Sequence, residues 1–170
     1  MNQSIYLKDV PDYYRRYIDL IPDGSYKDLM HLDLEKTKKA FMSLQNKPNY
    51  AYQSGKWTVL QVLSHLIDVE RVMVHRIHAF SRNESGSIPG FDHDDYVVQA
   101  DLSNKTIDSL LKEFELIRFG TIHLVSNLSD NELKRKGIAN NVEFTTSVLS
   151  WIILGHSIHH VNILNERYVD

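Results

Sequence analysis

Three histidines lie within five positions near the end of the chain, in the stretch GHSIHHVNILNERY at residues 155–168. His156 and His160 are four residues apart, so on a helix they lie one turn apart on the same face and could reach one small ion. His159 competes with His160, because a spacing of three from His156 also works. We prefer His156 with His160, since they continue an apolar seam and His159 lies towards its edge. The alternative is a pair of partly buried, hydrogen-bonded histidines that bind no metal.

A third imidazole from elsewhere in the chain would turn this pair into a metal site, because catalytic zinc sites use three protein ligands and leave one position open. His65 is the best candidate, since it lies among apolar residues of a predicted helix, where an imidazole needs a polar partner. His75 and His78 face away from His65 on the same helix and are expected in solvent. Three more histidines have no partner at a useful spacing and are interpreted as surface or loop residues: His31, His93 and His123.

Acidic side chains close to these histidines could orient the imidazoles or act as a general base. Asp68 follows His65 by about one turn, although a position on the helix surface is an equal alternative. Asp92, in the stretch FDHDDY, could bring a general base or a substrate contact from a connecting segment, or it could belong to a solvated acidic loop. We take Asp68 and Asp92 as the candidate catalytic residues.

Four amphipathic segments are predicted to be the long helices that position these side chains. We expect them at about residues 25–45, 58–80, 106–127 and 145–168, the last capped by Thr145 or Thr146. Thr58 with Gln61 has the form of a capping box, as does Ser129 with Glu132, which predicts a short extra helix before the last long one. Gly137 is expected to close that short helix, and no series of strands is predicted.

Further expectations concern packing within these helices. Gly155 costs about 1 kcal/mol in a helix interior, which suggests a neighbouring helix that approaches closely. Trp57 and Trp151 are interpreted as core anchors rather than as surfaces that bind substrate. The inward positions of the first helix are predicted to be Leu29, Leu32, Leu34, Ala40, Phe41 and Leu44.

The connection between the second and third helices is long, at about 25 residues, whereas two to eight are usual between bundle helices. Connections of that length either cross the bundle or cover a site. Four long helices joined in this way predict an all-α four-helix bundle whose helices do not simply alternate up and down. Residues 1–170 are expected to form a single domain, with residues 1–24 as an N-terminal arm.

Composition narrows the class of protein. The chain has 170 residues, of which 42% are hydrophobic and 24% charged, as in a globular domain with a core of its own. Nineteen basic and 22 acidic residues are scattered along it, so no nucleic-acid partner is expected. No apolar run approaches the about 18 residues of a membrane span, and no secretory signal is recognisable, so we expect no membrane partner and a cytoplasmic location. Because the chain has no cysteine, a transition metal must be held by histidine and carboxylate.

Four stretches together resemble a known family: GKWTVLQVLSHLIDVERV (55–72), PGFDHDDYV (89–97), EFELIR (113–118) and GHSIHHVNILNERY (155–168). In this order and at these separations they resemble the DinB-like, or DinB/YfiT-like, superfamily of proposed metal-dependent enzymes, over nearly the whole chain from about residue 15. The resemblance implies a four-helix bundle of up-down-down-up connectivity. It also implies one divalent transition metal, nickel or zinc most often and iron in some branches, held by His65, His156 and His160.

The resemblance leaves the reaction open, because the superfamily includes hydrolases and thiol S-transferases that use low-molecular-weight thiols. Three neutral imidazoles leave a metal its full 2+ charge, which activates either water or a thiol. We therefore expect a metal-dependent hydrolase or thiol S-transferase that acts on a small molecule, for which a thiol is one candidate, and that forms a homodimer. The alternative is a non-catalytic binding or dimerisation module with a structural metal, whose partner surface would include Val74, Ile77 and Phe80.

Overall fold

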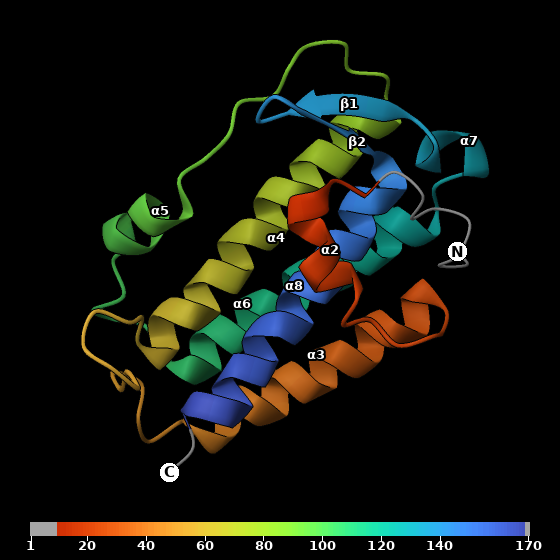
Figure 1. Ribbon diagram of the computed structural model, residues 1–170. Coiled ribbons are helices and arrows are strands. Elements are labelled where there is room, and N and C mark those ends of the chain that lie inside the picture. The colour runs from red at the N-terminus through yellow and green to blue at the C-terminus, as the bar shows by residue number, and fades with distance from the viewer. Residues whose placement is uncertain (1–9, 169–170) are drawn as a thin grey trace.

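The computed structural model describes residues 10–168, and four long helices dominate it. They are α3 (Tyr26–Ser43), α4 (Val59–Ser81), α6 (Ile107–Ser126) and α8 (Thr146–Arg167). In Figure 1, α3 and α8 run in one direction and α4 and α6 in the other, which is the predicted up-down-down-up order. Helices α4 and α3 each pack against both α6 and α8. The predicted all-α four-helix bundle is confirmed.

Helices α4 and α6 are neighbours that run the same way, so the chain must travel the length of the bundle between them. The segment 82–106 does this outside α4 (Figure 1) and contains α5 (His93–Gln99), a helix that the sequence pattern did not predict. The Asp92 side chain caps α5 by accepting hydrogen bonds from the amides of Asp94 and Asp95. Because α5 packs against α4, the long connection covers one side of that helix.

Side-chain caps define where the long helices begin. The Thr58 hydroxyl accepts the Gln61 amide, and the Gln61 side chain accepts the Thr58 amide in return, so the predicted capping box is present. A second box at Ser129 opens the short helix α7 (Asp130–Leu133). Thr145 rather than Thr146 caps α8, because its hydroxyl accepts the Val148 amide at 3.1 Å.

A β-hairpin follows the short helix α7, in the segment where Gly137 was expected to end that helix. Strands β1 (Lys136–Ala139) and β2 (Val142–Thr145) pair antiparallel. Asn140 and Asn141 connect them with φ of 51° and 60°, a left-handed conformation that asparagine tolerates and a two-residue hairpin turn requires. A Cβ at Gly137 would overlap the Phe80 ring, so this glycine lets β1 lie on α4 and does not close a helix. The prediction for this segment was wrong.

The core corrects two further expectations. Ile77 and Phe80 are fully buried and Val74 packs against the same cluster, so these residues form no partner surface. Leu32 is 49% exposed, and the neighbouring Met30 is fully buried in its place. Both errors concern which positions of a helix face inward, which a mixed three- and four-residue spacing does not decide.

Helix α2 (Asp12–Ile18) lies across α8 and forms part of the predicted N-terminal arm, whose first nine residues lie outside the described ones. A Cβ at Gly155 would overlap the backbone carbonyl oxygen of Tyr17, so the predicted close approach at this glycine is confirmed. Within residues 10–168, no helix is both long enough and apolar enough to cross a membrane.

The substitution Gly155→Ala is expected to lower the free energy of unfolding by about 1–3 kcal/mol, because the added methyl group pushes α2 away from α8. Gly120→Ala is the matched control, since no described atom lies within 4 Å of a Cβ added there in α6. The control should raise stability by up to about 1 kcal/mol through helix propensity alone. Urea denaturation of both variants measures this, and an equal change in the two would contradict the close contact.

Candidate metal site

Three histidines from two helices converge at one point. His65 extends from α4, and His156 and His160 extend from consecutive turns of α8. The Nε2 atom of His156 lies 3.1 Å from Nε2 of His65 and 3.1 Å from Nε2 of His160. One nitrogen from each ring lies within 4.8 Å of the other two. Nitrogens that each bind a tetrahedral ion at about 2.0–2.1 Å lie about 3.3 Å apart, so this spacing suits a shared ion.

Burial keeps these imidazoles neutral. His65 and His156 are 4% and 7% exposed, and His160 is half-buried. Burial, with a smaller contribution from nearby His93, lowers the pKa of His65 to about 3. Burial also lowers the pKa of His156 and of His160 well below the ordinary range, and the neighbouring histidines add to both shifts. Because a neutral imidazole is the form that binds metal, the three residues fit a divalent ion.

These shifts predict how the metal-free protein responds to acid. Between pH 6.5 and about 3, the unfolded chain protonates His65 while the folded chain does not, so stability falls as the pH falls. The expected loss is about 1.4 kcal/mol per pH unit for this residue, and His156 and His160 act in the same direction. Urea denaturation of metal-free protein at pH 6.5 and pH 5 measures the slope. If His65→Gln had the same slope as the native sequence, the buried neutral state of His65 would be refuted.

The three histidines line a hollow of about 590 Å³ beside α8. Its walls come from α2, from α4, from the long connection and from the β-hairpin. The lining residues outside the trio are Tyr13, Tyr14, Arg16, Tyr17, Trp57, Val69, Met73, Arg76, Phe91, Asp92, His93, Asp94, Asn140, Val142, Ile152 and His159. A small organic molecule therefore has room next to the converging imidazoles.

The other predicted site residues lie in different places. His159 is outside the trio but lines the hollow, with its ring edge-on to Tyr17 at a centroid distance of 5.3 Å. Asp92 lines the hollow and caps α5. Asp68 is half-buried and lies 4.0 Å from the exposed Arg71, and it is not among the described residues that line the hollow. The structure brings Asp92 to the site and does not bring Asp68 there.

His93 and Trp57 line the hollow beside the trio, a position that the sequence did not predict for either residue. The His93 side chain is exposed, as expected for a surface residue, but its ring lies 5.7 Å from the ring of His65, which spacing along the chain did not indicate. The Trp57 ring lies 4.6 Å from the His65 ring and is nearly parallel to the His160 ring at 6.5 Å, so it flanks two of the three histidines while it packs against the core. Trp151 is a fully buried core residue, as expected. The sequence feature that could have revealed the short helix carrying His93 is the run of acidic residues around it, because such runs are typical of a capped helix start.

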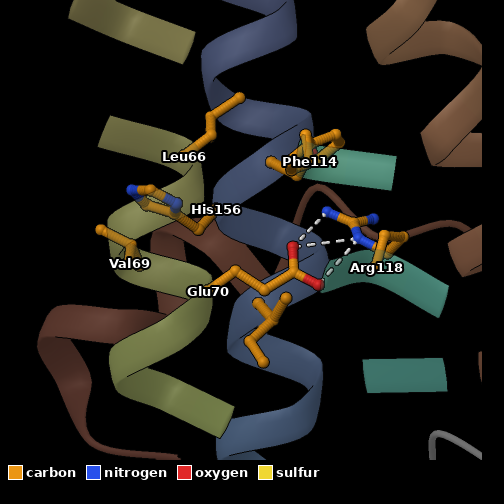
Figure 2. A pocket seen from close by; sticks show the side chains of 8 residues that line it. Leu66, Val69, Glu70, Phe114, Arg118 and His156 are labelled. Carbon is orange, nitrogen blue, oxygen red and sulfur yellow. Dashed lines mark hydrogen bonds and ion pairs between the residues drawn. The ribbon is translucent and has the colours of Figure 1, made fainter. Parts of the chain in front are cut away.

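A buried ionic cluster lies behind the trio, on the side of α6. Arg118 is fully buried, and its Nε donates to both carboxylate oxygens of Glu70, at 3.1 and 3.0 Å. Its Nη1 donates to Asp33 at 2.6 Å, and the Thr121 hydroxyl donates to Glu70 at 2.7 Å. Figure 2 shows Glu70 and Arg118 facing each other, with the His156 ring turned away from them towards Val69. The cluster joins α3, α4 and α6 next to the helix that carries two of the three histidines.

Comparison with known proteins places this arrangement in a family. The model of the DinB superfamily matches residues 35–164, which include all three histidines. The chain belongs to the DinB superfamily. The resemblance of the four sequence stretches is thereby confirmed, and the DinB-superfamily region spans all four long helices of the bundle except the start of α3 and the end of α8.

Two relatives of this DinB-superfamily chain carry names that concern function. A protein of Oceanobacillus iheyensis, named as a proposed metal-dependent hydrolase, is 25% identical over 112 residues, which are 65% of this chain and 64% of that protein. YfiT from Bacillus subtilis, described as a probable metal-dependent hydrolase with an unusual four-helix bundle topology, superimposes with a TM-score of 0.72 at 19% identity. The superposition covers 95% of this chain and 91% of YfiT, and it shows a shared fold.

Proposed function

We propose that this protein is a metal-dependent hydrolase that holds one divalent ion, zinc or nickel or else iron, through His65, His156 and His160. The observation that carries the proposal is the convergence of three neutral imidazoles, two of them buried and the third half-buried, at the wall of a hollow of about 590 Å³. The names of the Oceanobacillus and Bacillus relatives support it.

The side chains around the trio have separate tasks in this proposal. A bound divalent ion supplies Lewis acidity, which polarises a carbonyl group and lowers the pKa of water towards 7. The buried His65 and His156 and the half-buried His160 would hold the ion. Trp57 places an apolar ring beside His65 and near His160. His93 lies in the wall of the hollow beside His65, where its imidazole can contact a substrate or carry a proton.

The test is a hydrolysis screen with and without metal. Protein purified without nickel affinity resin is assayed against carboxylic esters and amides as isolated, after a chelator, and after zinc or nickel is restored. We expect hydrolysis that is lost on chelation and returns with metal, while circular dichroism shows that the metal-free protein stays folded. Loss of the fold on chelation, with no hydrolysis in any state, would instead support a binding module with a structural metal.

Thiol S-transfer stays a prediction, and the same protein preparation tests it. Electrophilic substrates are incubated with and without a low-molecular-weight thiol, and the products are separated by mass. A product that forms only with the thiol and only in the metal-loaded protein would replace hydrolysis by thiol transfer as the reaction of this site.

A further inference from the structure

A buried arginine without an acidic partner lines the same hollow. Among residues 10–168, two arginines are buried, Arg76 of α4 and Arg118 of α6. Arg118 forms ion pairs with Asp33 and Glu70. Arg76 is 3% exposed, and no carboxylate within the described range forms an ion pair with it. Burial of an unpaired charge is costly, so its presence needs an explanation.

The protein provides hydrogen-bond partners for only some of the five N–H donors of the Arg76 guanidinium. Nη2 donates to the Pro89 carbonyl oxygen at 3.2 Å, and Nη1 has a weak sulfur contact with Met73 at 3.8 Å. Nε has no hydrogen-bond partner. The guanidinium also lies 5.9 Å from the centroid of the Phe91 ring, on an aromatic wall of the hollow. These contacts orient the group but leave its charge uncompensated.

We propose that Arg76 is an anion-binding subsite, which takes a carboxylate or phosphate group of the substrate while the reacting part of the same molecule lies at the three histidines. A guanidinium matches the paired oxygens of either anion. In a hollow walled by aromatic side chains, such a pair is screened less than in water. The substrate supplies the negative charge that the chain does not place there.

The spacing of the two subsites describes the substrate further, and this step rests on the proposed function. His65 and Arg76 are eleven residues apart on α4, or about 16 Å along its axis, and the Arg76 side chain leans back towards the helix N-terminus, where His65 lies. Val69 and Met73 lie between them and also line the hollow. The substrate is therefore an elongated small molecule with an acid group at one end, an apolar middle and a hydrolysable group at the other.

The test measures binding of small anions to the full chain after the metal has been removed, so that direct coordination of the anion cannot contribute. Glutarate and glycerol phosphate are titrated by calorimetry, with neutral glutaramide as the uncharged probe. We expect at least one of the two anions to bind at least tenfold more tightly than glutaramide, and the stronger of them identifies the acid group. Arg76→Met should weaken that binding at least tenfold, and Arg76→Lys should weaken it less.

Two control variants separate this subsite from general attraction. Arg71→Met removes an exposed arginine of the same helix that pairs with Glu113 outside the hollow, and it should leave anion binding unchanged. Arg16→Met removes the exposed arginine of the hollow and should weaken binding less than Arg76→Met does. The melting temperature of Arg76→Met should not fall, because methionine removes an unpaired buried charge. Anions should raise the melting temperature of the native sequence but not of Arg76→Met, which reports the subsite independently of calorimetry.

Equal anion binding by Arg76→Met and the native sequence would overturn the inference, as would equal binding of the two anions and glutaramide. A larger effect of Arg16→Met than of Arg76→Met would also overturn it. Zinc affinity, measured separately, should be the same in Arg76→Met and the native sequence. Anion binding through Arg76 without any metal binding would refute the proposed metal-dependent hydrolase but leave the anion-binding subsite in place. Metal binding without any anion binding would refute the subsite but leave the proposed hydrolase in place.

Discussion

Replacing His65, His156 or His160 by alanine is expected to weaken zinc binding at least about 100-fold and to abolish any metal-dependent hydrolysis. Each substitution removes one of the three proposed ligands, in which the Nε2 atom of His156 lies 3.1 Å from Nε2 of each of the other two. Changes to residues that merely support a ligand already cost about 10- to 100-fold in metal affinity. The affinity is measured by competition with a chromophoric chelator, with circular dichroism to show that each variant folds.

His159→Ala is the matched control, because His159 is adjacent to His160 on α8 and lies outside the converging trio. It should change zinc affinity less than about threefold. If His159→Ala lost as much affinity as His160→Ala, the alternative pair of His156 with His159 would be the correct one. If none of the four substitutions changed the affinity, zinc would bind elsewhere.

Arg118→Met is expected to have the largest effect on folding, with a loss of about 3–5 kcal/mol in the free energy of unfolding. The substitution leaves the buried carboxylates of Glu70 and Asp33, which are 2% and 3% exposed, without their cation. Urea denaturation at pH 7.5 measures the change. The triple variant Asp33→Asn, Glu70→Gln and Arg118→Met should recover much of the loss, because it removes all three charges of this cluster together.

Arg71→Met provides the control for charge removal between the same two helices. Arg71 of α4 pairs with Glu113 of α6 at 2.5 Å, but its side chain is 52% exposed, so the loss should stay below about 1 kcal/mol. Equal destabilisation by Arg118→Met and Arg71→Met would show that burial of the Arg118 cluster contributes little. That outcome would also remove the reason for treating the cluster as the support of the helices that carry the histidines.

The helices and the three converging histidines could be predicted from the sequence because both depend largely on local spacing. Thr58 and Gln61 specify a helix start within four residues, and the four-residue step from His156 to His160 places the two imidazoles on one face. The choice of His65 needed only its position in an apolar seam. These features can be recognised in the sequence without knowledge of how the helices pack.

The parts that the sequence did not reveal depend on contacts between distant segments. His93 reaches the site only because the long connection returns α5 to α4. Gly137 permits a strand because the Phe80 ring lies beneath it, and Arg118 is buried because α3 and α4 each place a carboxylate against it. Spacing within one helix contains no information about such partners.

The metal content of the native protein tests the central claim most directly. The chain is expressed without an affinity tag, purified without chelator, and analysed for zinc, nickel and iron, and metal-free protein is then titrated with each ion. The account predicts about one equivalent of a divalent transition metal per chain and one binding site on titration. Protein that carries well under one equivalent of every metal and binds none when titrated would contradict it.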